Sequence, residues 1–279
     1  MKCGIIRSVK RRTRRILFWL AVISFGIASL VAVRYAQGYQ YDFTARRFVR
    51  TGAVSVSANT DARLFVDDRL IGPLSFLGNS GGSNRLLPGT HEVRLVRDGW
   101  SEWRKETLVI EGRLTEFPHA LLLPTDEASL DALRVEASIS LSGSRTLKNA
   151  PKPTPALRGT TAVAEVSVGR WVLRGDRLLE MDTASGSLIA EHVLGFSPAS
   201  DGDRVLWWTR NELWVRWDAA TGGQPARAPG ERLLLSRWTT PIAGAAWFRD
   251  FDHVVADLGP SGYRVLETDT RGGVNSIRF

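Results

Sequence analysis

Hydrophobic and polar positions follow two different patterns along this chain. An apolar run of eighteen residues, 16–33, lies near the N-terminus and contains no charged side chain. A helix of this length spans roughly 27 Å, close to the hydrocarbon thickness of a bilayer. From Gly52 onward, apolar and polar residues instead alternate in short segments separated by turn residues. The pattern predicts one transmembrane helix followed by a mainly β protein.

The residues that flank the apolar run predict its orientation. Residues 1–15 contain seven Lys or Arg and no acidic residue. Because positively charged flanks stay in the cytoplasm, we expect a cytoplasmic tail at 1–15, a membrane helix at 16–33 and an extracytoplasmic remainder. Residues 34–51 read as a polar and aromatic stalk. Trp19 at one end of the run, and three tyrosines at the other, suit the two interfacial belts. These tyrosines are Tyr35, Tyr39 and Tyr41.

A cleaved signal peptide is the main alternative to an anchor. Gly26 and Ala28 are small residues at the spacing that signal peptidase recognises, so cleavage would fall before Ser29. The apolar run continues for five residues beyond Ala28, however, which is longer than a usual signal-peptide core. We favour the uncleaved anchor over this alternative, and both over a buried core helix.

Charge and cysteine content limit the partners and the compartment. The formal net charge is +8, and residues 1–15 supply seven of these charges, so the remainder carries about +1. This distribution argues against nucleic acid as a partner and points to the lipid bilayer. Cys3 is the only cysteine, so the exported region has no disulfide. Such a region suits a prokaryotic cell envelope better than a eukaryotic secretory route.

Residues 52–123 predict a small antiparallel β-sandwich. Period-two alternation occurs in four segments, and Asp-Asp, Gly-Pro, Pro-Gly and Asp-Gly pairs separate them. Short strands at such regular spacing are typical of a sandwich. The four segments are Ala53–Ser57, Ala62–Val66, His91–Val96 and Glu106–Ile110.

The order of these motifs, from about residue 54 to 123, resembles the PEGA domain, a small β-sandwich of prokaryotic surface and envelope proteins. The matching pieces are an opening strand, a Leu-Phe-Val-Asp-Asp hairpin, a Gly-Pro turn, a Leu-Pro-Gly-Thr-His stretch and an Asp-Gly-Trp. Asn59–Ala62 stands where the family has its namesake tetrapeptide, and Asp68 replaces the usual turn glycine. The pieces are Ser55–Ser57, Leu64–Asp68, Gly72-Pro73, Leu87–Val93 and Asp98–Trp100.

Residues 124–162 are expected to form a linker. Acidic residues followed by Leu130 and Leu133 at helical spacing predict a short helix from Asp126 to Val135. Alternate prolines then favour an extended segment over Lys148–Ala156.

Residues 163–279 return to a strand pattern with an imperfect repeat. The segment around Val205 recurs 49 residues later at Val254, and strands end in Asp before Gly-containing turns at Asp218 and Asp269. A period near fifty is typical of β-propeller blades. The Ser-Pro and Asp-Gly-Asp-Arg run at 197–204 resembles the signature of TolB-like and WD40-type propellers. Two to three blades fit here, so we expect an incomplete propeller. Either the chain is truncated, or another subunit supplies the missing blades, or the segment is an open sheet or sandwich instead.

The chain shows little sign of catalytic chemistry. Gly78–Gly82 matches the Gly-x-Ser-x-Gly pattern of a nucleophile elbow, but it lacks the strand before and the helix after that an elbow needs. The four histidines, His91, His119, His192 and His253, have no metal-ligand spacing. We therefore predict no enzyme, no cofactor and no metal site.

Tryptophan is the remaining signal. Seven of the ten tryptophans lie in 163–279, and adjacent rings must point to opposite faces of a strand. Packing in the core is the favoured interpretation. The alternative is that Trp208 and Trp217 are exposed as contacts for a sugar polymer or a protein.

The combined prediction is a single-pass protein with its bulk outside the cell membrane, which binds or scaffolds without catalysis at the envelope. The membrane lipid bilayer is the expected partner, with envelope polysaccharide or envelope proteins as further candidates. The alternative is the carbohydrate-binding part of a cell-wall-active protein whose catalytic or remaining propeller portion is missing.

Overall fold

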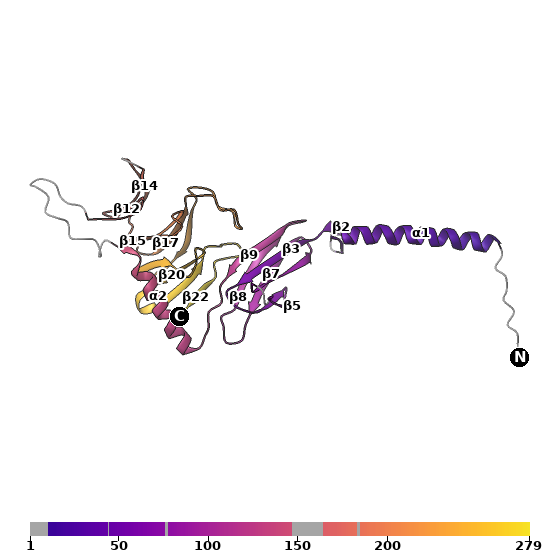
Figure 1. Ribbon diagram of the computed structural model, residues 1–279, viewed down its shortest axis with the longest axis horizontal. Helices are drawn as coiled ribbons and strands as arrows, with labels where there is room; N and C mark the ends of the chain where they lie inside the picture. The colour runs from indigo at the N-terminus through magenta and orange to yellow at the C-terminus, as the bar shows by residue number, and fades with distance from the viewer. Residues whose placement is uncertain (1–10, 44, 76–77, 147–163, 183–184) are drawn as a thin grey trace, which may run out of the picture. The chain divides into compact units, whose positions relative to one another are not determined.

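The computed structural model describes residues 11–43, 45–75, 78–146, 164–182 and 185–279, and it is mainly β (Figure 1). Helix α1, Arg11–Ala36, contains the predicted span and is long and apolar enough to cross a membrane. None of its residues is buried. Contacts divide the chain into two compact units. The first consists of residues 1–54, 83–90 and 108–115, and the second of 55–82, 91–107 and 116–279.

The predicted stalk contains a β-hairpin. Strand β1, Tyr39–Asp42, pairs antiparallel with β2, Arg47–Arg50. Tyr41 lies opposite Phe48, and their rings meet edge to face at 5.2 Å. Because side chains alternate along a strand, Tyr39, Tyr41 and Phe48 share one face of the hairpin.

The segment predicted to be a β-sandwich forms two small sheets, with strand orders β6-β3-β9 and β5-β4-β7-β8. Trp103 of β8 packs edge to face against Phe117 of β9, with ring centroids 5.3 Å apart. Asp67 and Asp68 form the two-residue turn of the predicted hairpin, and both have positive φ, as a type I′ turn requires. The strands are β3 Gly52–Ala58, β4 Arg63–Val66, β5 Arg69–Pro73, β6 Ser80–Leu86, β7 Gly89–Val96, β8 Trp103–Val109 and β9 Leu114–Ala120.

Two local predictions differ from the structure. Gly72 and Pro73, which we expected to form a turn, are the last residues of β5. The predicted helix is longer than expected, because α2 runs from Glu127 to Ser142. Asp126 caps it by accepting a hydrogen bond from the Ser129 backbone N–H. The extended segment predicted at Lys148–Ala156 lies outside the described residues.

The C-terminal region forms three sheets, each built on four consecutive antiparallel strands, and β10 is added to the edge of the second sheet. The first is β11-β12-β13-β14, the second β10-β15-β16-β17-β18 and the third β19-β20-β21-β22. No closed barrel or propeller is found in the described chain. The bounds are β10 Arg145–Thr146, β11 Glu165–Val168, β12 Trp171–Arg174, β13 Arg177–Asp182, β14 Ser185–Ala190, β15 Gly195–Pro198, β16 Arg204–Trp208, β17 Glu212–Trp217, β18 Arg232–Arg237, β19 Gly244–Trp247, β20 His253–Asp257, β21 Tyr263–Glu267 and β22 Ser276–Arg278, with a 3-10 turn at Gly259–Ser261.

Apolar cores fill the spaces between neighbouring C-terminal sheets. Trp171 and Trp207 pack between the first and second sheets, and Leu206 packs with Val254 between the second and third. Helix α2 lies against the third sheet and covers its other face with Leu133 and Ala137 (Figure 1). Val205 is the second residue of β16, and Val254 is the second residue of β20. The two strands take equivalent places in the series β15–β18 and β19–β22, as the spacing of the two valines predicts.

An arginine joins each of the first two C-terminal sheets to the next. Arg170 donates to the Gly202 carbonyl at 2.9 Å and pairs with Asp218 at 2.8 Å. Arg204 donates to the Phe251 carbonyl at 2.7 Å and pairs with Asp252 at 3.3 Å. Arg170 directly precedes β12 and Arg204 is the first residue of β16, so the bond between neighbouring sheets repeats at nearly equivalent places.

Candidate functional site

Strand β8 carries a lysine on its buried face. Its residues alternate between buried and exposed, so Trp103, Lys105, Thr107 and Val109 all point inward. Only 1% of Lys105 is exposed to solvent. A lysine is almost never buried this far without partners, because desolvation of an ammonium group costs several kcal/mol.

The partners of Lys105 come from the third C-terminal sheet and the loop after β21. Its Nζ lies 2.9 Å from Glu267 Oε2 and donates to the carbonyls of Asp269, at 2.7 Å, and Gly273, at 2.6 Å. An ammonium group has three N–H bonds, and three acceptors surround it here. The lysine therefore has no donor left for a ligand.

Glu267 is held by further groups besides the lysine. The indole N–H of Trp103 donates to Oε1, and Asn275 Nδ2 lies 3.3 Å from Oε2. Burial raises the pKa of Glu267, and the charges of Lys105 and His253 with the hydrogen bonds from Lys105 and Trp103 offset only part of that rise. We call Trp103, Lys105, Glu267, Asn275 and the carbonyls of Asp269 and Gly273 the Lys105 cluster.

The loop that supplies the two carbonyls lies directly on β8. Gly272 has a φ of +64°, and a Cβ atom there would overlap the Glu106 carbonyl oxygen. Arg271 Nη2 also donates to the Glu116 carbonyl at 2.6 Å. Glycine is therefore required at 272 both for its backbone conformation and for the close approach.

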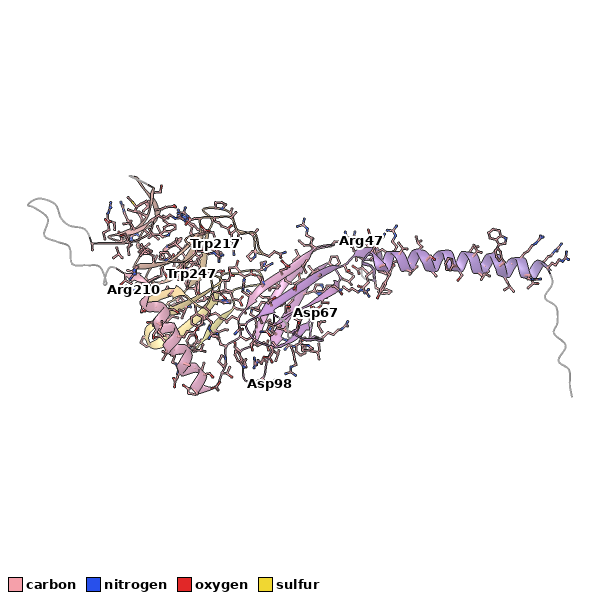
Figure 2. The ribbon with its side chains drawn as sticks, in the orientation of Figure 1. Arg47, Asp67, Asp98, Arg210, Trp217 and Trp247 are labelled. Carbon is pink, nitrogen blue, oxygen red and sulfur yellow. The ribbon has the colours of Figure 1, made fainter. Side chains whose placement is uncertain are left out.

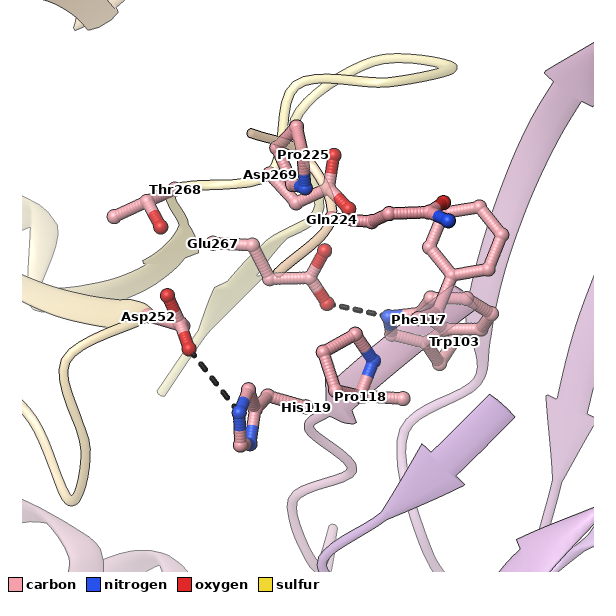
Figure 3. A pocket seen from close by; sticks show the side chains of 11 residues that line it. Trp103, Phe117, Pro118, His119, Gln224, Pro225, Asp252, Glu267, Thr268 and Asp269 are labelled. Carbon is pink, nitrogen blue, oxygen red and sulfur yellow. Dashed lines mark hydrogen bonds and ion pairs between the residues drawn. The ribbon is translucent and has the colours of Figure 1, made fainter. Parts of the chain in front are cut away.

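A small cavity of about 40 Å³ adjoins the Lys105 cluster (Figure 3). Trp103, Phe117 and Pro118 line it together with His119 and Asp252, whose Nε2 and Oδ2 atoms are 3.3 Å apart. This volume holds one or two water molecules. It is too small for a substrate or a cofactor.

A wider recess of about 170 Å³ shares His119 and Asp252 with that cavity. Arg204, Trp217 and Arg227 line its other side. Arg204 is paired with Asp252 at 3.3 Å, and Arg227 Nη1 lies 2.7 Å from Glu231 Oε1. Because both guanidinium groups already have carboxylate partners, the recess does not have the unpaired charge that would capture an anion.

Each histidine lies beside one aspartate. His253 is buried, and its Nδ1 lies 2.8 Å from Asp250, while its Nε2 has no hydrogen-bond partner. Burial on its own would raise the pKa of Asp250, but the hydrogen bond and charge of His253 outweigh it and lower the pKa. The other pairs are His91–Asp67 at 2.6 Å, His119–Asp252 at 3.3 Å and His192–Asp176 at 3.1 Å.

The two tryptophans singled out from the sequence both lie in the core. Trp208 is 1% exposed and Trp217 is 2% exposed, and both belong to the cluster between the second and third C-terminal sheets. Figure 2 shows Trp217 within this region, where the Arg227 guanidinium lies 4.5 Å from the ring centroid. Neither ring offers a free face to a sugar, so the structure places them as the packing interpretation expects.

The nucleophile-elbow motif has the wrong surroundings. Ser80 begins strand β6 and no helix follows it. No group of three His, Cys, Asp or Glu side chains that could hold a metal ion occurs in the described ranges.

Sequence reasoning missed the Lys105 cluster. The available signal was the alternation Trp-Arg-Lys-Glu-Thr-Leu-Val, which puts Lys105 on the same face as Trp103. Its partners lie far along the chain, and no local pattern indicates them.

Comparison with known proteins found no family model that matches the chain and no curated protein similar to it. Chemistry alone therefore indicates what the Lys105 cluster can do. Its buried charges are paired and its cavity has the size of water. The arrangement can join strand β8 rigidly to the third C-terminal sheet.

Proposed function

We propose that this chain is a single-pass membrane protein that displays a β-rich extracytoplasmic region and binds or scaffolds without catalysis at a prokaryotic cell envelope. The observation that carries this proposal is α1. Its apolar residues are all exposed, and seven basic residues precede them. An exposed apolar helix of this length needs a bilayer to cover it.

The β-rich region is proposed to combine a PEGA-like sandwich with an incomplete propeller-like domain. The Asp67-Asp68 hairpin turn supports the first part. Three successive sheets of antiparallel strands, joined by Arg170 and Arg204 at nearly equivalent places, support the second. Envelope proteins fit such a scaffold better than a sugar polymer, because the candidate sugar platforms Trp208 and Trp217 are buried.

Alkaline carbonate extraction of membranes tests the anchor. We expect the full chain to stay in the membrane pellet, and the double variant Ile23→Arg/Ile27→Arg to be released, because each arginine at a helix centre costs about 3 kcal/mol of insertion. Ile71→Arg, on the exposed strand β5, is the matched control and should stay in the pellet. Release of the wild-type chain would contradict the proposal, and an intact mass that begins at Ser29 would establish the signal-peptide alternative.

A further inference from the structure

We propose that the first unit holds a binding site for one anionic phospholipid beside the end of α1. The inference rests on the proposed membrane anchor and adds a ligand to it. The site is a groove of about 620 Å³ between the last turns of α1 and the hairpin β1–β2. We call it the juxtamembrane groove. Its lining is mainly apolar and consists of Leu30, Val31, Arg34, Tyr35, Tyr39, Gln40, Tyr41 and Phe48.

The groove is continuous with the surface that faces the bilayer. Leu30 and Val31 belong to the apolar run of α1 and are 62% and 58% exposed. Tyr41 and Phe48 extend that apolar surface onto the hairpin, and Phe43 at its tip is 83% exposed. An aromatic surface beside the end of a membrane span suits the interfacial layer of a bilayer. A lipid acyl chain can therefore enter the groove without crossing water.

A polar compartment adjoins the apolar one. A second hollow of about 160 Å³ shares Tyr35, Tyr39 and Gln40 with the groove and adds Arg85. The Arg85 guanidinium lies 4.1 Å from the Tyr35 ring centroid, and that of Arg34 lies 5.3 Å from the Tyr39 ring centroid. An apolar volume with Arg34 in its wall, next to a polar one that contains Arg85, matches an amphipathic molecule with a negative headgroup.

The two cations are available to such a headgroup. Within the described residues, neither Arg34 nor Arg85 lies within 4.0 Å of a carboxylate oxygen, although most arginines of the second unit do. Arg85 also donates to the Tyr35 hydroxyl, and this contact orients its planar group. Arginine binds phosphate through parallel N–H bonds, and basic residues near a membrane surface favour anionic lipids. Figure 2 shows a further arginine, Arg47, on the hairpin near the end of α1.

Native mass spectrometry of the full chain in detergent provides the test. The delipidated protein is mixed with dioleoyl phosphatidylglycerol or with dioleoyl phosphatidylcholine, and retained lipid is counted. We expect phosphatidylglycerol to be retained at least about tenfold better, because each basic residue near an anionic headgroup favours it by roughly fivefold. Excess glycerol phosphate should not displace the lipid, since it cannot fill the apolar compartment.

Three variants separate the two compartments from general surface effects. Arg34→Gln/Arg85→Gln should abolish the preference for phosphatidylglycerol, and Phe48→Ser should lower the retention of both lipids. Arg177→Gln, at an exposed position in the second unit, is the matched control and should behave like the wild type. Tryptophan fluorescence melting in the same detergent confirms that each variant is folded.

Equal retention of the two lipids by the wild type would overturn the proposal, and so would displacement of the lipid by glycerol phosphate. An unchanged preference in the double arginine variant would also overturn it. Because these measurements are made in detergent, they do not depend on membrane topology. If the anchor itself is absent, carbonate extraction releases the wild-type chain, and that result is independent of the lipid measurements.

Discussion

The ammonium group of Lys105 lies 2.9 Å from a carboxylate oxygen of Glu267, and both side chains are almost entirely withdrawn from solvent. One residue belongs to a small sheet near the start of the β-rich region, and the other ends a strand close to the C-terminus. The pair with its hydrogen bonds therefore joins distant parts of the second unit. It is the feature of this unit whose loss we expect to be most damaging.

Replacement of Lys105 by methionine should destabilise the second unit by about 3–5 kcal/mol, because Glu267 would remain buried without its partner charge. Arg104→Met is the matched control. It changes the neighbouring residue on the exposed face of β8, and loss of surface ion pairs there costs at most about 1 kcal/mol. Chemical denaturation of the detergent-solubilised chain, followed by tryptophan fluorescence, measures both. Equal free energies of unfolding for the two variants would refute the assigned role.

Glu267 should give the second unit a specific dependence on pH. Its pKa in the folded chain is raised above the ordinary value of 4.5, so the folded state binds the proton more tightly than the unfolded state does. The stability that this group contributes is therefore complete below about pH 4.5 and is lost as the pH rises through the folded pKa. The Glu267→Gln variant cannot show this loss.

Denaturation of the wild type and of Glu267→Gln between about pH 4 and about pH 8 provides the measurement. The free energy of unfolding of the wild type should fall relative to that of the variant as the pH increases. A difference that grows in favour of the wild type with rising pH would show that the folded pKa is lowered instead.

Gly272→Ala should disrupt the close packing of the loop after β21 against β8. Alanine there combines a positive φ with a Cβ atom that overlaps the Glu106 carbonyl oxygen, so the loop must move. Gly273 also has a positive φ, but nothing lies within 4 Å of the place that a Cβ atom would take there, so Gly273→Ala isolates the cost of the backbone conformation, about 1 kcal/mol. We expect a melting temperature for Gly272→Ala that is clearly below that of Gly273→Ala. Identical melting curves for Gly272→Ala and Gly273→Ala would contradict the close approach of Gly272 to the Glu106 carbonyl.

Asp68→Gly should stabilise the hairpin β4–β5. Asp68 has a φ of 59° in a turn that favours glycine at this position, so the substitution relieves strain worth roughly 0.5–1 kcal/mol. It also removes a surface ion pair with Arg94, which offsets part of the gain. Asp68→Val, which is β-branched, should lower stability. A melting temperature for Asp68→Gly below that of Asp68→Val would contradict the turn assignment.

Local patterns were sufficient to predict several elements of this fold. The apolar run predicts α1, and the Asp67-Asp68 pair between alternating segments predicts the hairpin β4–β5. The spacing of Val205 and Val254 predicts equivalent strands in successive sheets. The first two signals lie within a short stretch of sequence, where hydrophobic period and turn chemistry act directly. The third is a strand pattern that recurs 49 residues later.

The Lys105 cluster was not predicted because it depends on contacts between distant segments. Nothing near Lys105 in the chain indicates Glu267 or the two carbonyl acceptors. The hairpin β1–β2 was missed for a different reason, because its turn lacks the Asn-Gly or Asp-Gly pair that usually marks one. The choice between packed and exposed tryptophans likewise required the positions of the neighbouring sheets.

The most direct test of the proposed topology is the side of the membrane on which each end of the chain lies. Cys3 is the only cysteine, so the wild type reports on the N-terminal side and a Cys3→Ser/Ser200→Cys variant reports on the exposed turn after β15. We predict that a membrane-impermeant maleimide labels the cysteine at 200 in intact spheroplasts and labels Cys3 only after lysis. Labelling of Cys3 before lysis, with position 200 protected, would contradict the orientation and the extracytoplasmic role.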